Sequence, residues 1–209
     1  MGPALRSGVF LDRDGVVNDV ILRDGKGYPP PDLARLRILP GVRDALRALR
    51  RADLPLVVVT NQPDVATGLQ RREVVEAMHA HLCHELPLDA IFVCYHTDEH
   101  RCRCRKPEPG MLQDAAERFG IDLGRSFMVG DRWRDIEAGR RVGCTTFWID
   151  RGYAERKPER PDHIVRDLAE ASATILRELQ AARTGADEPA PDPDNHFESN
   201  RGATTCDAS

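Results

Sequence analysis

The chain has 209 residues, of which 41% are hydrophobic and 31% charged, and its formal net charge at pH 7 is −4. This composition is typical of one soluble globular domain, and no apolar run approaches the ~18 residues that a membrane span needs. The negative charge argues against a broad surface for nucleic acid or anionic lipid, so we expect neither nucleic acid nor a membrane as a partner.

Short apolar runs alternate with amphipathic stretches along the chain, which is the pattern of a parallel sheet covered by helices. The predicted strands span residues 9–12, 56–60, 90–94, 127–130 and 145–149. The predicted helices span residues 41–52, 71–86, 109–119, 134–142 and 164–182. From residue 184 onward almost no periodic apolar residue remains. The sequence therefore predicts one α/β domain over residues 1–183 and a disordered tail over 184–209.

Polar residues follow three of these apolar runs. Asp12 and Asp14 end the first run, Thr60 ends the second, and Asp131 follows the fourth. In open parallel sheets the ligand site lies at the carboxyl ends of the strands. We therefore expect these distant residues to meet in one crevice.

The residues of this crevice are of the types that phosphate-ester cleavage requires. A carboxylate such as Asp12 can attack phosphorus and form an aspartyl-phosphate, and a second acid such as Asp14 can protonate the leaving alkoxide. Gly15 permits the tight turn beside them. Lys106 supplies a compact positive charge, and Thr60 can donate to a phosphate oxygen.

A cation is also required, because two carboxylates beside a phosphate dianion repel one another. Mg²⁺ suits such all-oxygen ligands. Asp131 is the natural distal ligand. Asp135, on the following helix turn, either binds the metal or caps the helix.

Four segments in this order resemble the four motifs of the haloacid dehalogenase (HAD) superfamily: Leu11-Asp12-Arg13-Asp14-Gly15, Thr60-Asn61-Gln62, Arg105-Lys106-Pro107 and Val129-Gly130-Asp131 with Asp135. The resemblance covers residues 9–166 and implies a three-layer Rossmann-like fold. It further implies that Asp12 is the nucleophile and Asp14 the general acid/base. Thr60 and Lys106 would bind the transferring phosphoryl group, and Mg²⁺ would be held by Asp12, Asp131 and the backbone carbonyl of Asp14.

The intervals between the motifs are too short for a separate cap domain. Substrate selection is therefore expected to come from loops at about residues 15–30, 62–69 and 95–109. Asn18, Asn61, Arg105 and Arg132 are the candidates for binding the substrate, and Arg105 could hold a second, non-reacting phosphate in bidentate fashion.

Four soft ligands lie close together at Cys94, His96, Cys102 and Cys104. Three thiols and one imidazole make a tetrahedral Zn²⁺ set, and a site closed by four protein ligands is structural. The zinc loop, residues 94–104, would thus stiffen the segment that carries Lys106, with His100 as the weaker alternative to His96.

The other cysteines and histidines are assigned no metal. With no room for a secretory signal before the first strand, we expect a cytoplasmic protein without disulfides. Three histidines and a cysteine on the second predicted helix are interpreted as surface histidines with one packed thiol, not as a second site: His79, His81, His84 and Cys83.

The zinc ligands and the following Arg-Lys-Pro-Glu-Pro-Gly-Met narrow the resemblance to the D-glycero-D-manno-heptose 1,7-bisphosphate 7-phosphatases and the related histidinol-phosphate phosphatases. Asn18 also fits that pair. The cysteine-rich segment favours the heptose branch. The five residues between His96 and Cys102 are fewer than heptose enzymes often have.

The expected function is therefore a Mg²⁺-dependent phosphatase that removes the 7-phosphate of the heptose bisphosphate, acting as a monomer on a small phosphorylated sugar. Histidinol-phosphate phosphatase is the alternative. A polynucleotide 3′-phosphatase is disfavoured by the negative net charge. The non-enzyme alternative is a zinc-stabilised interaction module with a decayed phosphatase site.

Overall fold

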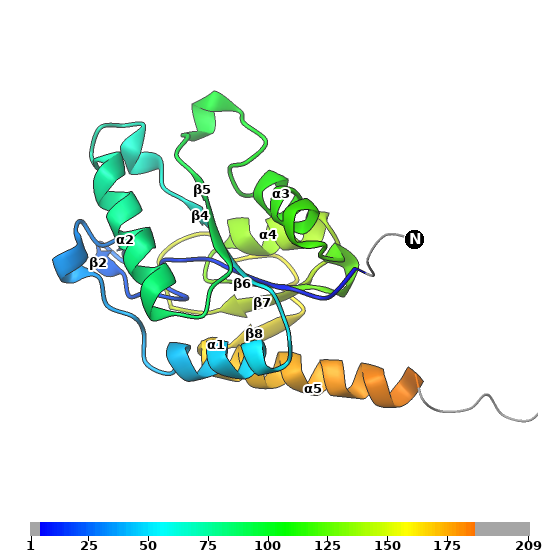
Figure 1. Ribbon diagram of the computed structural model, residues 1–209. Coiled ribbons are helices and arrows are strands. Elements are labelled where there is room, and N and C mark those ends of the chain that lie inside the picture. Colours follow the sequence, from blue (N-terminus) through cyan, green and yellow to red (C-terminus); the bar gives the residue numbers. More distant parts are fainter. Residues whose placement is uncertain (1–4, 187–209) are drawn as a thin grey trace, which may run out of the picture.

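Six parallel strands form the central sheet of the computed structural model, which describes residues 5–186 (Figure 1). In chain order the strands are β1 (Val9–Leu11), β4 (Leu56–Asn61), β5 (Ala90–Cys94), β6 (Phe127–Gly130), β7 (Thr145–Ile149) and β8 (His163–Val165). Their spatial order is β5-β4-β1-β6-β7-β8. The strand β1 therefore lies inside the sheet, where Val9 pairs with Leu56 on one side and Phe127 on the other.

Helices cover both faces of this sheet (Figure 1). They are α1 (Val42–Arg51), α2 (Arg72–Glu85), α3 (Gly110–Phe119), α4 (Trp133–Arg141) and α5 (Leu168–Ala186). Alternate side chains of each strand point to opposite faces. Leu11 and Val58 pack with apolar residues of α1, α2 and α5, whereas Phe10 and Val59 pack with α3 and α4. The domain is thus a three-layer sandwich with two cores.

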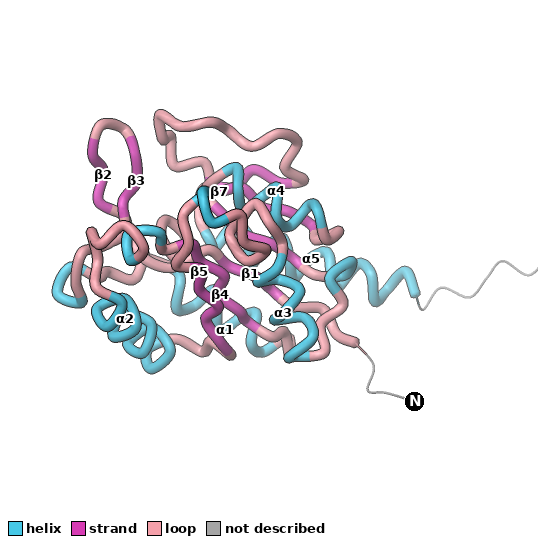
Figure 2. Tube along the Cα trace, turned by 90° about the horizontal axis from the view of Figure 1, so that it is seen from above, coloured by secondary structure: helices cyan, strands magenta, loops and turns pink. Residues whose placement is uncertain are grey.

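A two-stranded antiparallel hairpin, β2 (Ile21–Arg23) and β3 (Lys26–Tyr28), projects beyond the main sheet (Figure 2). Short 3₁₀ turns occupy Leu33–Arg35, Pro63–Val65, Asp98–His100 and Leu123–Arg125. Within residues 5–186 this hairpin is the only sheet besides the central one. The expectation of a HAD-like α/β domain without a separate cap is confirmed for the described chain.

The five predicted strands are confirmed, but a sixth was missed. Ile164 and Val165, predicted to begin the last helix, pair with Trp148 and Ile149 as the edge strand β8. The helix α5 starts at Leu168 instead, and Asp167 accepts the backbone N–H of Glu170 within its first turn. The predicted helix start was wrong because three apolar-rich residues carry no periodicity that separates a strand from a helix.

The C-terminal boundary also differs from the prediction. The helix α5 continues to Ala186, so residues 184–186 are helical. The rest of the predicted tail lies outside the described residues. No helix in the described part of the chain is long and apolar enough to cross a membrane.

Truncation of a core side chain tests this packing. Leu112 on α3 is fully buried, and Leu112→Ala is expected to lower the free energy of unfolding by about 2–5 kcal/mol through lost burial and a residual cavity. Urea denaturation followed by circular dichroism measures the loss. Leu69, which is 80% exposed, is the matched control, and Leu69→Ala should change stability by less than about 0.5 kcal/mol. Equal effects of the two substitutions would contradict this core assignment.

Candidate active site

Three carboxylates meet at the carboxyl ends of the central strands. Asp12 follows β1, Asp131 follows β6, and Asp135 lies in the first turn of α4. One oxygen from each lies within 4.8 Å of the others, and all three side chains are buried. The close approach depends on Gly15, which has a φ of +85° and whose Cβ, if present, would lie 1.9 Å from Asp131 Oδ2.

Lys106 neutralises part of this cluster. Its Nζ lies 2.7 Å from Asp12 Oδ1 and 2.6 Å from Asp135 Oδ1, and it donates to the carbonyl of Val59 at 2.7 Å. An ammonium group has three N–H donors, and all three are used here. Although burial opposes charge, the two carboxylates raise the pKa of Lys106 above its ordinary value, so the side chain is a cation.

Asn61 fixes the segment that carries Lys106. Its amide Nδ2 donates to the Lys106 carbonyl at 3.0 Å, and its Oδ1 accepts the Lys106 backbone N–H at 3.1 Å. Both polar ends of Asn61 are therefore engaged with the protein. Asn61 lines the cavity at the site, and in this geometry its contacts orient Lys106.

Asp14 lies beside the acidic cluster but is held by a different set of donors. Asn18 Nδ2 donates to Asp14 Oδ1 at 2.9 Å, and Gln62 Nε2 donates to Oδ2 at 2.7 Å. The neighbouring Arg13 contacts both oxygens at 2.9–3.2 Å. Burial alone would raise the pKa of Asp14, but Arg13, Asn18 and Gln62 hold it below its ordinary value. Asn18 is fully buried behind this carboxylate.

Thr60 and Gln62 connect the second strand to Asp14. The Gln62 amide that donates to Asp14 also donates to Thr60 Oγ1 at 2.9 Å. Both residues are at most 2% exposed. Gln62 was quoted in the sequence motif without a role. Its position two residues after a strand-terminal threonine, on the same side of an extended segment, is the signal that could have identified it.

His79 was also missed, and the expectation that it is a surface histidine was wrong. On α2 the buried positions are Val75, Met78, His79 and Leu82, an i, i+3, i+4, i+7 stripe, and His79 is 9% exposed. Its Nε2 lies 2.9 Å from Nη1 of the fully buried Arg13. His81, His84 and Cys83 are exposed, as predicted for the histidines, whereas the thiol is not packed in the core.

The acidic cluster has the properties of a divalent-cation site. Both carboxylate oxygens of Asp131 are buried and have no hydrogen-bond partner within residues 5–186. Burial, with Asp12 and Asp135 nearby, raises the pKa of Asp131 well above its ordinary value. Burial likewise raises the pKa of Asp12 to about 6, against the opposing effect of Lys106. Buried carboxylates without protons or partners are costly, and a hard dication removes that cost, so these residues fit Mg²⁺.

Asp135 caps α4 and also lies within the acidic cluster. Its Oδ2 accepts the backbone N–H of Arg132 at 3.0 Å, which caps α4, while Oδ1 faces Lys106. It also belongs to the group of three carboxylates. Capping and a place at the cation site are compatible here.

The cluster opens into a cavity of about 270 Å³ that is rich in arginine. It is lined by Asp12, Asp14, Lys26, Gly27, Tyr28, Pro29, Asn61, Pro63, Asp64, Arg105, Lys106, Arg132, Arg134, Asp135 and Glu155. The hairpin β2–β3 forms one wall. Lys26 and Tyr28 belong to β3, within the segment of residues 15–30 that was expected to select substrate, although neither was named singly. Arg134, in the first turn of α4, and Glu155, in a loop, were not identified because they have no local sequence signature.

The arginines of this cavity are braced by acidic residues. Arg105 Nε donates to Asp98 Oδ1 at 2.7 Å, and Arg134 Nη2 lies 2.9 Å from Asp98 Oδ2. Arg132 donates to the Gly27 carbonyl of the hairpin and lies 3.7 Å from Glu155. Arg105 Nη1 is buried and has no partner among the described residues. A buried guanidinium nitrogen in this state is suited to receive an anion.

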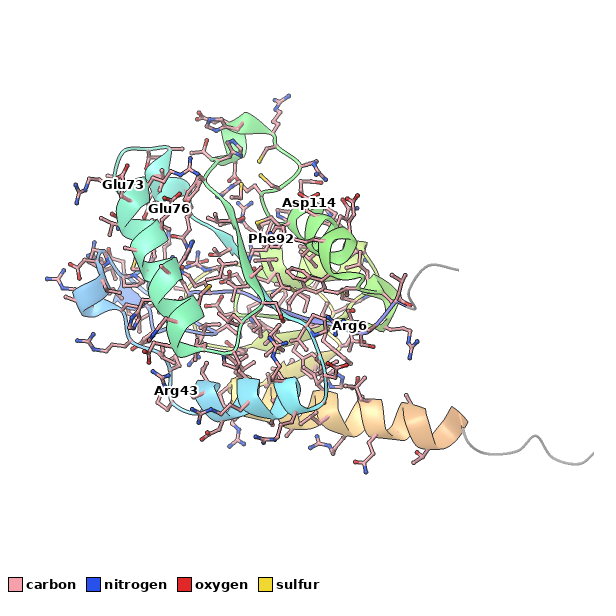
Figure 3. The ribbon with its side chains drawn as sticks, viewed as in Figure 1. Arg6, Arg43, Glu73, Glu76, Phe92 and Asp114 are labelled. Atoms are coloured by element: carbon pink, nitrogen blue, oxygen red, sulfur yellow. The ribbon has the colours of Figure 1, made fainter. Side chains whose placement is uncertain are left out.

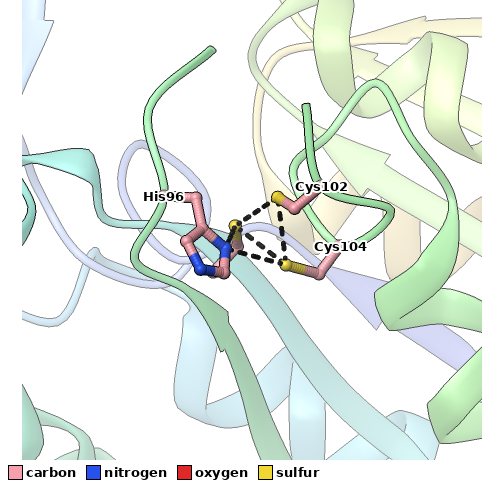
Figure 4. Close-up of side chains that lie close together, drawn as sticks. His96, Cys102 and Cys104 are labelled. Carbon is pink, nitrogen blue, oxygen red and sulfur yellow. Dashed lines mark hydrogen bonds between the residues drawn. The ribbon is translucent and has the colours of Figure 1, made fainter. Parts of the chain in front are cut away.

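The second ligand cluster is formed by Cys94, His96, Cys102 and Cys104 (Figure 4). Five of the six separations among their Sγ and Nδ1 atoms are 3.1–3.6 Å. The edges of a tetrahedral site with Zn–S bonds of ~2.3 Å measure about 3.8 Å, close to these values. His100 instead contacts Thr97, with the Thr97 N–H donating to its Nδ1 at 3.2 Å. The predicted ligand set, with His96, can hold zinc.

This chain is similar in sequence to known phosphatases. A family model described as HAD-hydrolase-like matches residues 103–171. The D-glycero-beta-D-manno-heptose-1,7-bisphosphate 7-phosphatase of Bordetella bronchiseptica is 35% identical over 182 residues, covering 81% of this chain and 98% of the relative. The protein of the same name from Escherichia coli K12 is 33% identical over 190 residues, covering 84% and 96%.

Solved structures extend the similarity to three dimensions. The crystal structure of the B. bronchiseptica D,D-heptose 1,7-bisphosphate phosphatase, complexed with magnesium and phosphate, aligns with a TM-score of 0.70 at 32% identity, covering 82% of this chain and 99% of that one. A HAD-like phosphatase from Mesorhizobium loti aligns with a TM-score of 0.65 at 29% identity, covering 84% and 88%. With relatives of this identity matched over nearly their whole length, the chain belongs to the HAD-like phosphatase family that includes the D-glycero-beta-D-manno-heptose-1,7-bisphosphate 7-phosphatases.

Proposed function

We propose that this protein is a Mg²⁺-dependent phosphatase that removes the 7-phosphate of D-glycero-D-manno-heptose 1,7-bisphosphate. The observation that carries the proposal is the buried group of Asp12, Asp131 and Lys106 at the opening of an arginine-lined cavity. Family membership supports the same chemistry, since the relatives bear this activity in their names.

The reaction runs in two displacements at phosphorus. An oxygen of Asp12 forms a bond to phosphorus while the bond from phosphorus to the ester oxygen breaks. Arg13, Asn18 and Gln62 favour the ionised form of Asp14 in the free protein, so Asp14 takes up a proton from solvent when the substrate binds and gives that proton to the departing alkoxide. Water then attacks the aspartyl-phosphate and passes a proton to Asp14, and the bond from Asp12 to phosphorus breaks. Asp12 and Asp14 both line the cavity, so both are accessible to one phosphate group.

Lys106 and the metal ligands control the charge of this site. Lys106 orients Asp12 through its 2.7 Å contact and favours the ionised, nucleophilic form. Asp12, Asp131 and the Asp14 carbonyl would hold Mg²⁺, with Asp135 as a further ligand. When bound, the cation would neutralise the charge that develops on the phosphoryl oxygens. The Thr60 hydroxyl would donate a hydrogen bond to one of these oxygens.

Arg105 supports a bisphosphate as substrate. Its Nη1 has no partner in residues 5–186, and Arg132 and Arg134 line the same cavity. A second phosphate would meet a cationic wall, whereas the ammonium group of histidinol phosphate would be repelled by it. Histidinol phosphate is therefore the second candidate substrate. Asn18 and Asn61, predicted to bind substrate, are proposed to act through Asp14 and Lys106.

The zinc cluster would hold the loop that leads into Arg105 and Lys106. A closed site of four protein ligands leaves no position for activating water, so zinc would be structural. Three thiolate ligands suit a reducing compartment, and we propose a cytoplasmic location and a monomer without nucleic-acid partners. The interaction-module alternative predicts no phosphate release from any ester.

Loss of the nucleophile is the first test. Asp12→Asn should abolish phosphate release from p-nitrophenyl phosphate in the presence of Mg²⁺, because an amide is a poor nucleophile towards phosphorus. The exposed Asp44 gives a matched control, and Asp44→Asn should keep full activity. Circular dichroism confirms folding of both variants. An active, folded Asp12→Asn protein would remove Asp12 from the role of nucleophile.

Substitution of Arg105 tests whether this side chain binds the second, non-reacting phosphate of the substrate. A charge-assisted hydrogen bond contributes about 1.5–3 kcal/mol, so Arg105→Ala should lower kcat/KM for the heptose 1,7-bisphosphate by roughly 10- to 100-fold. The value for heptose 7-phosphate should change by less than about threefold. The exposed Arg47 serves as control through Arg47→Ala. Equal losses on the two substrates would contradict a contact with the second phosphate.

Disruption of the zinc cluster should be visible without any activity assay. Cys102→Ser is expected to release the metal, measured as zinc per chain by elemental analysis, and to lower the Tm, because metal binding stabilises the folded loop. Cys83 is exposed and lies outside the cluster, so Cys83→Ser should keep both zinc and Tm. Full zinc content in Cys102→Ser would exclude Cys102 as a ligand.

A further inference from the structure

A chain of contacts runs from the interior of α2 to the acid/base carboxylate. Arg13 is the largest fully buried side chain among the described residues, and its Nε and Nη2 contact both oxygens of Asp14 at 2.9–3.2 Å. The remaining terminal nitrogen, Nη1, lies 2.9 Å from His79 Nε2. The guanidinium is thus fixed from two sides, by Asp14 and by His79.

Only one arrangement of protons allows the contact between Arg13 Nη1 and His79 Nε2. A guanidinium has donors and no lone pair, so His79 Nε2 must accept and the imidazole must be neutral, with its proton on Nδ1. Burial, together with the charge of Arg13, lowers the pKa of His79 to about 4, which keeps the acceptor lone pair free at neutral pH.

The position of His79 on α2 indicates that its side chain does more than fill space in the core. The exposed side of α2 carries acidic residues such as Glu73 and Glu76 (Figure 3). The other buried positions of the helix are Val75, Met78 and Leu82, which are all apolar. An imidazole in that stripe would be poorly suited to the core if it did not meet a polar partner, and the partner it meets is Arg13.

We propose that His79 is a positioning residue for the general acid/base, acting through Arg13 to hold the Asp14 carboxylate in line with the leaving group. Asp14 is also contacted by Asn18 and Gln62, whose amides donate to Oδ1 and Oδ2 respectively. Without the His79 acceptor, Arg13 Nη1 would be a buried donor with no partner, and the guanidinium would move to find one. The Asp14 carboxylate would then lose its fixed orientation.

This inference rests on the proposed phosphatase function and is tested through the leaving group. General acid catalysis matters for a poor leaving group such as phenoxide and little for 2,4-dinitrophenoxide, which departs without a proton. The readout is the ratio of kcat/KM for 2,4-dinitrophenyl phosphate to that for phenyl phosphate, with Mg²⁺ present. Because kcat/KM reports the first displacement, the second step does not enter the ratio.

Three variants separate positioning from packing. His79→Leu removes the acceptor, His79→Gln keeps one in the amide oxygen, and His81→Leu is the matched control on the exposed side of the same helix. General acid–base catalysis contributes roughly 10²–10⁴-fold, so misplacement of Asp14 should raise the ratio by about tenfold or more in His79→Leu. The ratio should stay within about threefold of the original in His79→Gln and His81→Leu.

Each result decides the matter. A folded His79→Leu protein with an unchanged ratio overturns the proposal, whether it keeps full activity or loses activity equally on both esters, since a structural defect does not depend on the leaving group. If His79→Leu does not fold, His79→Met, which also lacks a strong acceptor, takes its place: a raised ratio supports the proposal, and an unchanged ratio in the folded protein overturns it. If the unaltered protein hydrolyses neither ester, the proposed function fails instead.

Discussion

The ion pair between a buried lysine and two buried carboxylates is the interaction on which the site depends. Lys106 is 2% exposed, and its three N–H donors are used by Asp12, Asp135 and the Val59 carbonyl. A buried ammonium without such partners would lose its proton, and the carboxylates without it would gain theirs. Lys106 therefore favours the ionised form of Asp12, the form that the proposed mechanism requires, while Asp131 has free lone pairs that a cation could use.

The fold places these groups together at the carboxyl edge of the central sheet. Asp12, Thr60 and Asp131 come from three adjacent parallel strands, β1, β4 and β6, whose carboxyl ends coincide. Lys106 is the exception, because it comes from a loop. The loop is held at two places: Asn61 brackets the Lys106 backbone, and the Cys/His cluster closes the segment just before it. These two contacts restrain the loop on both sides of the Lys106 segment.

The same loop supplies the cationic rim of the cavity. Asp98, inside the zinc loop, accepts from Arg105 and pairs with Arg134 of α4. The candidate zinc cluster and the proposed substrate-binding arginines are thereby connected, since the acid that contacts both arginines lies in the chain between His96 and Cys102. The rim presents guanidinium groups at the mouth, while Lys106 and the carboxylates remain buried at the bottom.

The sequence by itself determined the central strands, the order of the site motifs and the four candidate zinc ligands. These features are local: an apolar run followed by Asp12, or Cys94 two residues from His96, is recognisable because the chemistry requires those residues at that spacing. Only the tertiary structure decided that Ile164 lies in a strand, because three residues become β8 by pairing with β7 and not by their own preference. It alone decided that His79 is buried against Arg13, 66 residues away, and that the Asn61 amide binds the backbone of Lys106. Contacts between distant segments have no sequence periodicity, so packing had to reveal them.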